Sequence, residues 1–194
     1  MIPASISLLT ICGIDELPDH GTRAVTHVLS VIDPERADLT AFADYGEHHR
    51  TTLRFHDIID PLPGMIPPNR DHMEAILAFG ASLRDSRGER TEGHLLVHCH
   101  MGISRSTAAM ITLMAQAEPD VPETLLFERL RGIRPQAWPN SVMIGMADDM
   151  LDRKGRLTDE LRRHYGRQLV TQPNYRRWMS DLGRAREVEM AVDP

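Results

Sequence analysis

The stretch His98-Cys99-His100-Met101-Gly102-Ile103-Ser104-Arg105-Ser106 decides the fold of this chain. Residues 93–97, just before it, form a short run rich in aliphatic side chains, which predicts a buried strand. Residues 105–117 are rich in alanine and methionine and contain neither glycine nor proline, which favours a helix. The stretch is therefore a loop between a strand and a helix, in which five residues separate a cysteine from an arginine.

The residue types of this loop suit the transfer of a phosphate group to sulfur. The first N–H groups of a helix lack intrahelical partners and lie at the positive end of the helix dipole, so they can cradle an anion. Gly102 tolerates the positive φ that such a turn needs, and Arg105 offers a planar pair of donors to two phosphate oxygens. The same field favours the thiolate of Cys99, and Ser106 could donate to that sulfur when it leaves.

With His98 in front, the pattern of Cys99, Arg105 and Ser106 resembles the signature of the cysteine-dependent protein tyrosine phosphatases. Residues 102–106, Gly-Ile-Ser-Arg-Ser, most resemble the dual-specificity branch of that superfamily. The resemblance implies a phosphomonoester hydrolase with Cys99 as the nucleophile, a cysteinyl-phosphate intermediate, and no metal or other cofactor. The expected phosphate-binding residues are those of the loop after the cysteine: His100, Met101, Gly102, Ile103, Ser104, Arg105 and Ser106.

Three other interpretations of the loop are weaker. Cys99 could be a buried structural cysteine, but this leaves the spacing of the glycine and the arginine unexplained. His98, Cys99 and His100 could bind a metal, yet alternate side chains of a strand point to opposite faces and no second ligand cluster completes a tetrahedron. A cysteine protease needs a base histidine, and nothing marks one among the ten histidines.

The composition describes one globular unit. The chain has 194 residues, 41% of them apolar, with two cysteines and a net charge of −6. This predicts one domain with a core of its own and an appended piece. The resemblance implies a phosphatase domain over residues 1–152, which leaves a C-terminal helical extension over 153–194, docked on the same domain. The acidic balance and the lack of a basic run argue against nucleic acid as a partner. With no convincing signal peptide or membrane-spanning run and so few cysteines, we expect a cytoplasmic protein without a membrane partner.

Strands and helices alternate along the chain. Strands are expected at 5–12, 26–32, 51–56 and 93–97. Helices are expected to begin at 69 and at 105 and to cover 122–131, 158–168 and 173–188, and one further helix is expected to end at about 151. This alternation predicts an α/β fold with a central, mainly parallel sheet of four to five strands flanked by helices. The phosphate loop then lies at the carboxyl ends of the strands, where such sheets bind ligands.

The general acid is expected in the segment that follows the third strand. A leaving alkoxide or phenoxide needs a proton, and a carboxylic acid can deliver it. In the phosphatases that this sequence resembles, an aspartate just after a strand upstream of the cysteine does so, and Asp57 matches that position best. Asp60 competes, because the segment before Cys99 is longer than usual and its proline-rich part could change which carboxylate faces the pocket.

Two further residues match the resemblance. Arg134 and Asn140 lie in a segment that supports the active-site loop in the dual-specificity phosphatases, although a solvated charge and a helix N-cap explain them equally well. Cys12 packs in the first strand by default, and a redox partnership with Cys99 is a minor alternative.

The expected partner is a phosphorylated protein or another phosphomonoester. The resemblance implies phosphotyrosine, with phosphoserine or phosphothreonine in addition, while the lack of lysine in the loop argues against inositol phosphates. The alternatives are a small non-protein phosphomonoester as substrate, or a phosphate-binding pseudoenzyme that serves as an interaction module.

Overall fold

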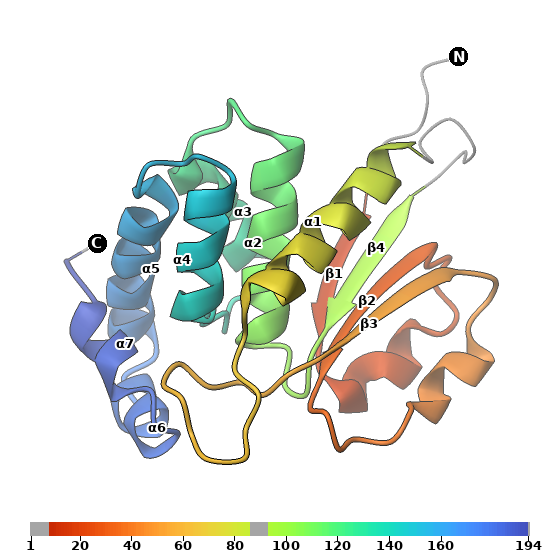
Figure 1. The fold of residues 1–194 in the computed structure, drawn as a ribbon, viewed down its shortest axis with the longest axis horizontal. Helices are drawn as coiled ribbons and strands as arrows, with labels where there is room; N and C mark the ends of the chain where they lie inside the picture. The colour runs from red at the N-terminus through yellow and green to blue at the C-terminus, as the bar shows by residue number, and fades with distance from the viewer. Residues whose placement is uncertain (1–7, 86–92, 194) are drawn as a thin grey trace.

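The computed structural model describes residues 8–85 and 93–193. Its four strands lie in the order β1-β4-β2-β3 and are all parallel (Figure 1). They are β1 (Leu8–Cys12), β2 (His27–Ile32), β3 (His49–Arg54) and β4 (His94–His98). The expected α/β fold with a parallel central sheet is therefore confirmed, and the part of the predicted first strand before Leu8 lies outside the described residues.

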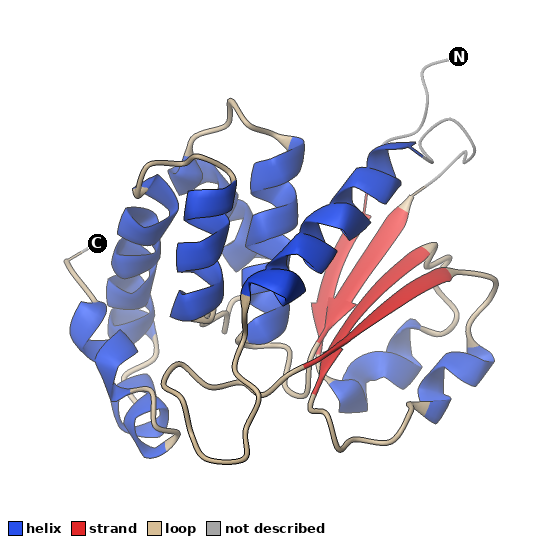
Figure 2. Ribbon diagram, in the orientation of Figure 1, coloured by secondary structure: helices blue, strands red, loops and turns tan. Residues whose placement is uncertain are grey.

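Helices cover both faces of the sheet, but very unequally. The α-helices lie on one face and beyond it, and two short 3-10 helices cover the other (Figure 2). The α-helices are α1 (Arg70–Asp85), α2 (Arg105–Ala117), α3 (Glu123–Ile133), α4 (Ser141–Met150), α5 (Arg156–Thr171), α6 (Tyr175–Asp181) and α7 (Ala185–Met190), and the 3-10 helices are η1 (Ile14–His20) and η2 (Thr40–Asp44).

Alternation along the strands divides the core into two parts. In β2, Leu29 and Val31 face the large cluster under the α-helices, whereas Val28 faces the smaller cluster under η1 and η2. In β4, Val97 faces the large cluster and Leu96 faces the smaller one. Both faces of the sheet are therefore buried, as expected of parallel strands. This rigid packing fixes the carboxyl ends of β2, β3 and β4, from which the candidate site is built.

Several elements differ from the sequence-based expectation. Strand β3 begins and ends two residues earlier than 51–56, and η1 and η2 were not predicted. The helix expected over 173–188 is instead two, because Gly183 adopts φ +75° between α6 and α7. On α1 the buried face includes Phe79, whereas Leu77 is half-buried.

The C-terminal helices share the main core. Trp138, between α3 and α4, stacks on Tyr165 of α5 with ring centroids 4.2 Å apart, and its edge meets Tyr175 of α6 at 5.9 Å. Tyr165 is fully buried and donates its hydroxyl hydrogen bond to the Pro139 carbonyl. Residues 156–190 are thus held against the segment before α4, and the turn between α6 and α7 contacts the phosphate loop, where Arg184 donates a hydrogen bond to Ser104. Among the residues that the structure describes, no helix is long and apolar enough to cross a membrane.

Candidate active site

The loop between β4 and α2 has its carbonyl groups turned outward. The carbonyl of His100 accepts from the Ile14 amide at 2.9 Å, that of Ile103 from the Trp138 amide at 2.8 Å, and that of Ser104 from the first turn of α2. Within the described part of the chain, no hydrogen bond involves the amide N–H groups of residues 101–104. The loop can therefore direct these donors at an anion above the N-terminus of α2.

Arg134, the residue directly after α3, holds two further loop carbonyls from outside. Its Nε donates to the Gly102 carbonyl at 3.0 Å and its Nη2 to the Met101 carbonyl at 2.9 Å. Glu16 of η1 fixes the other side of the guanidinium with two hydrogen bonds of 2.7 and 2.8 Å. Of the two interpretations of Arg134 from sequence, support of the loop is therefore the one that the contacts favour.

Gly102 is required at its position for two reasons. Its φ is +68°, a conformation that side-chain-bearing residues rarely adopt. A Cβ there would also lie 2.5 Å from the Cys12 carbonyl carbon and 2.8 Å from Arg134 Nη2. The loop backbone thus runs directly against the end of β1, and any larger residue would push it away.

Cys99 follows β4 and lines the pocket with 3% of its surface exposed. Its Sγ lies 3.1 Å from Ser106 Oγ, in the first turn of α2, so the serine hydroxyl can donate to a thiolate. Burial lowers the pKa of His98 to about 4, so this histidine is neutral and hydrogen-bonded to Ser30 at 2.7 Å. Burial and the nearby Glu16 raise the pKa of Cys12 to about 12, which keeps that thiol protonated and a poor partner for redox exchange.

Arg105 is held by one nitrogen only. Its Nη1 donates to Asp33 Oδ1 at 2.6 Å and to the Phe55 carbonyl. Its Nε is buried without a partner among the described residues, and no hydrogen bond there involves Nη2. The free Nε and Nη2 form one edge of the guanidinium, and such an edge matches two oxygens of a phosphate group. Asp33 fixes this edge in place before any ligand arrives.

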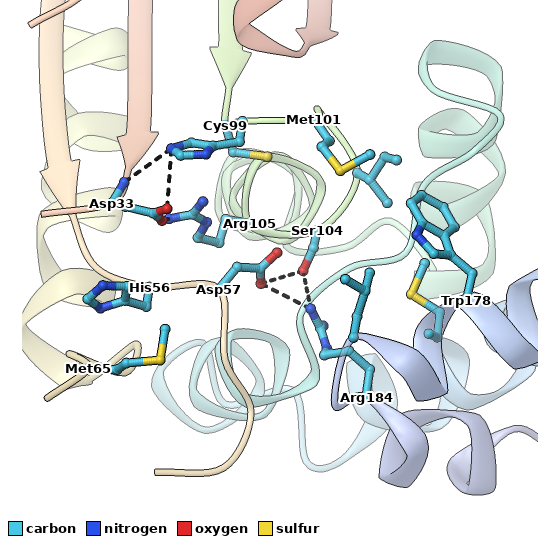
Figure 3. Close-up of a pocket in the computed structure, with 14 residues that line it drawn as sticks. Asp33, His56, Asp57, Met65, Cys99, Met101, Ser104, Arg105, Trp178 and Arg184 are labelled. Carbon is cyan, nitrogen blue, oxygen red and sulfur yellow. Dashed lines mark hydrogen bonds and ion pairs between the residues drawn. The ribbon is translucent and has the colours of Figure 1, made fainter. Parts of the chain in front are cut away.

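Asp57 and Asp60 lie in different surroundings. Asp57 lines the pocket, and its Oδ1 accepts from Ser104 Oγ at 2.7 Å, from Asn140 Nδ2 at 3.0 Å and from Arg184 Nη1 at 3.1 Å. Its Oδ2 takes no part in these bonds and points to the side of Cys99 (Figure 3). Asp60 is 56% exposed, pairs with Arg186 at 3.1 Å and is not among the residues that line the pocket.

Charges and hydrogen bonds keep Asp57 ionised. Burial alone would raise the pKa of this carboxyl, but the charges of Arg184 and Arg105 and the hydrogen bonds from Ser104 and Asn140 outweigh burial, so the pKa is lowered. Asn140 also caps α4, because its Oδ1 accepts from the amides of Val142 and Met143. Both interpretations of Asn140 from sequence therefore apply at once.

The pocket has a polar floor and an apolar wall. Its volume is about 270 Å³. The loop and Arg105 form the floor beside Asp57, as Figure 3 shows. The apolar lining comes from three parts of the chain: Met65 in the segment before α1, Met101 and Ile103 in the loop, and Trp178, Met179 and Leu182 in and after α6. An organic group attached to a bound phosphate would contact this wall.

Two contributions to the site were missed by the sequence reasoning. Asp33 directly follows the strand expected at 26–32 and was given no role, although the carboxyl end of a parallel strand is where ligand-binding residues gather. Trp178, Leu182 and Arg184 lie in a segment without a motif, so their place in the pocket follows only from how α6 and α7 pack. In the described part of the chain, no cluster of three or more histidine, cysteine, aspartate or glutamate side chains could hold a metal ion.

Comparison with solved structures identifies the fold. The chain matches the Yvh1 phosphatase domain from Chaetomium thermophilum with a TM-score of 0.50 and 23% identity, covering 79% of this chain and 97% of that domain. It matches the PTP-2 phosphatase of Cydia pomonella with a TM-score of 0.56 and 18% identity, covering 77% and 90% of the two chains. The fold is therefore that of the protein tyrosine and dual-specificity phosphatases. By sequence, no protein-family model and no curated protein matches.

The same fold also occurs in a protein described by its interactions. The human tyrosine phosphatase-like serine/threonine/tyrosine-interacting protein matches with a TM-score of 0.50 and 17% identity, covering 74% of this chain and 87% of that one. Overall shape therefore does not choose between a phosphatase and a binding module. The choice depends on the side chains of the site.

Proposed function

We propose that this chain is a phosphomonoester hydrolase of the protein tyrosine and dual-specificity phosphatase type, with Cys99 as the nucleophile. The observation that carries the proposal is the free edge of Arg105, which lies beside outward-turned loop carbonyls and a cysteine in hydrogen-bond contact with Ser106. Amides, guanidinium and thiolate together suit one tetrahedral dianion. A structural cysteine would not need this arrangement.

The reaction runs in two steps. The Cys99 thiolate attacks phosphorus, the S–P bond forms, and the P–O bond to the leaving group breaks while Asp57 gives that oxygen its proton. Water then attacks the cysteinyl-phosphate, Asp57 takes a proton from the water, and the S–P bond breaks to release inorganic phosphate. Ser106 stabilises the departing thiolate at 3.1 Å. Arg105 and the loop amides hold the phosphoryl oxygens throughout.

The ionised state of Asp57 is compatible with the role of acid. A phosphomonoester has its second pKa near ~6, so below that pH it arrives carrying one proton, which can pass to the carboxylate. The negative charge of the bound phosphate also favours the protonated carboxyl. In the second step the ionised form is the one required, and Arg184 and Asn140 support it.

The proposed substrates are phosphorylated proteins, with phosphotyrosine first. The apolar wall formed by Met65, Trp178 and Leu182 suits an aromatic ring next to the phosphate. A smaller apolar phosphomonoester would contact the same wall and is the alternative substrate. The test measures hydrolysis of both kinds of substrate by the same protein.

The experiment is hydrolysis of an aryl phosphate and of a phosphotyrosine peptide, without metal and with a chelator present. The parent should be active, Cys99→Ser inactive, and Asp57→Ala impaired most with the poorest leaving group, whereas Asp60→Ala should resemble the parent. A defect in Asp60→Ala that grows with leaving-group basicity would make Asp60 the acid instead. No turnover by the parent, with the phosphopeptide still bound, would overturn the enzyme in favour of a binding module.

A further inference from the structure

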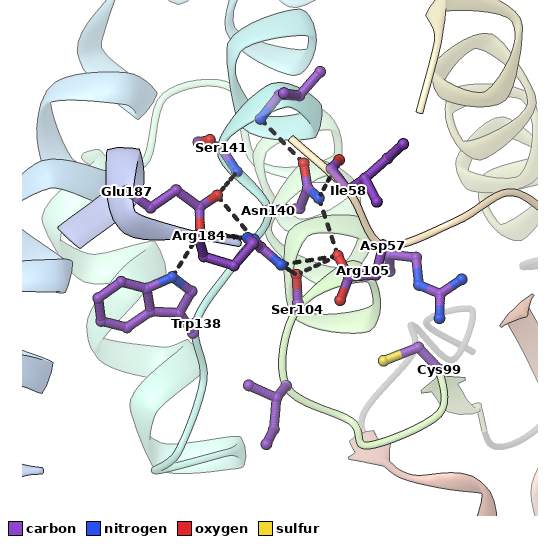
Figure 4. Close-up of polar contacts among 12 residues, drawn as sticks. Asp57, Ile58, Cys99, Ser104, Arg105, Trp138, Asn140, Ser141, Arg184 and Glu187 are labelled. Atoms are coloured by element: carbon purple, nitrogen blue, oxygen red, sulfur yellow. Dashed lines mark hydrogen bonds and ion pairs between the residues drawn. The ribbon is translucent and has the colours of Figure 1, made fainter. Parts of the chain in front are cut away.

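The turn between α6 and α7 places a buried arginine next to Asp57. Arg184 has 4% of its surface exposed. Its Nη1 donates to Asp57 Oδ1 at 3.1 Å and to Ser104 Oγ at 3.0 Å. Figure 4 shows the guanidinium lying between this pair and Glu187. The residue thus connects the C-terminal extension to both the phosphate loop and the proposed acid.

Glu187 fixes the orientation of that arginine. Its two oxygens accept from Arg184 Nε and Nη2, each at 2.8 Å, which leaves Nη1 as the nitrogen that faces the pocket. Glu187 is fully buried and also accepts from Trp138 Nε1 and the Ser141 amide, both at 2.7 Å. The carboxylate, which belongs to α7, is therefore also fixed by the start of α4, so Arg184 has little freedom to turn.

We propose that Arg184 is a positioning residue for the general acid: held by Glu187, it ties one oxygen of Asp57 to the loop, turns the other toward Cys99, and favours the ionised carboxylate. This inference rests on the phosphatase activity proposed above and extends it to the C-terminal extension. An ionised, oriented carboxylate is what the hydrolytic step needs, because water must lose a proton to it.

Arg184 acts together with other charges around Asp57. Arg105 on α2 is the second cation that lowers the pKa of this carboxyl, and Ser104 and Asn140 supply neutral donors. His100 and Tyr165 act on Asp57 at longer range, and His56, Asp33 and Cys99 line the same pocket. Glu187 contacts Arg184 instead of Asp57. Of the two cations, only Arg184 is outside the proposed phosphate-binding residues, so it can be changed without removing a phosphate ligand.

Arg186, in the first turn of α7 and two residues after Arg184, provides a matched control. Its Nη2 pairs with Asp60 at 3.1 Å and donates to the Ile59 carbonyl at 2.6 Å, so it also connects α7 to the segment after β3. It is 53% exposed and has no contact with Asp57. Arg186→Gln therefore removes the same charge two residues away and leaves the proposed acid untouched.

The test is the pH profile of kcat with a saturating aryl phosphate. The alkaline limb of kcat reports the group that must be protonated in the enzyme–substrate complex. Loss of a cation in contact with a carboxylate raises the pKa of that carboxyl, typically by about one to three units. In Arg184→Gln the alkaline limb should therefore move to higher pH by about one unit or more. In Arg184→Lys and Arg186→Gln the alkaline limb should stay at the same pH as in the parent.

A second variant guards against misfolding, since Arg184→Gln leaves Glu187 buried without its cation. The double variant Arg184→Gln/Glu187→Gln removes both charges and should show the same upward movement. An unmoved limb in both variants, with kcat unchanged or lowered equally at every pH, would overturn the inference. That result leaves the proposed function standing if Cys99→Ser is inactive, whereas an inactive parent or an active Cys99→Ser would refute the proposed function itself.

Discussion

Replacing Arg134 with methionine should loosen the phosphate loop, because one guanidinium holds two of its carbonyls. The side chain is 12% exposed, and its bonds to the carbonyls of Met101 and Gly102 measure 2.9 and 3.0 Å. A hydrogen bond from a charged donor contributes about 1.5–3 kcal/mol. Two such bonds, reduced for partial access of water, give a loss of about 2–4 kcal/mol in the free energy of unfolding.

The effect on activity follows from the position of the loop amides. Freed carbonyls let residues 101–104 rotate, and a misplacement of about 1 Å in a catalytic group can cost ~10²-fold in rate. We therefore expect kcat/KM for an aryl phosphate to fall by about two orders of magnitude in Arg134→Met. Urea unfolding and steady-state kinetics measure the two effects.

The control for this prediction is Arg129→Met, on the helix that ends just before Arg134. Arg129 is 42% exposed and pairs with Glu118 on the surface, so its loss should cost less than ~1 kcal/mol and leave kcat/KM intact. If Arg134→Met retained the parental stability and activity, the claim that this guanidinium shapes the loop would be wrong.

Two other replacements test parts of the same pocket. In Ser106→Ala the departing thiolate loses its hydrogen-bond donor at 3.1 Å, so cysteinyl-phosphate should accumulate. Stopped-flow measurements should then detect a burst of aryl alcohol close to one equivalent of enzyme. Equal slowing of the burst phase and of the steady-state phase would count against this role of Ser106. In Trp178→Ala the KM for an aryl phosphate should rise about two- to twelvefold, as expected for the loss of ~0.5–1.5 kcal/mol of aromatic contact, with kcat nearly unchanged. A small alkyl phosphate should show no such change, and an equal rise for both substrates would refute a contact with the ring.

The sequence was most informative where the necessary contacts are local. The strand, loop and helix around Cys99 lie within 25 residues, and local patterns identified all three. Gly102 belongs to the same category, because the positive φ is a property of its own backbone. Such features depend on neighbours along the chain, which a single sequence displays directly.

Long-range contacts were not visible in the sequence. Arg184 meets Ser104 across 80 residues and Asp57 across 127, and nothing distinguishes it beforehand from the other arginines of the extension. Asp33 meets Arg105 across 72 residues. The break at Gly183 was also missed, because the apolar spacing of residues 173–188 continues through it. These positions are set by tertiary packing, which one sequence records only indirectly.

The hydrogen bonds that hold Arg105 through Nη1 have a consequence for binding entropy. A free arginine side chain carries about 2 kcal/mol of rotamer entropy, most of which is lost when a guanidinium is immobilised by a ligand. Here Asp33 and the Phe55 carbonyl have already immobilised it in the folded protein. A tetrahedral oxyanion therefore binds an arginine whose side-chain entropy was already lost during folding, so that cost does not reduce the binding free energy.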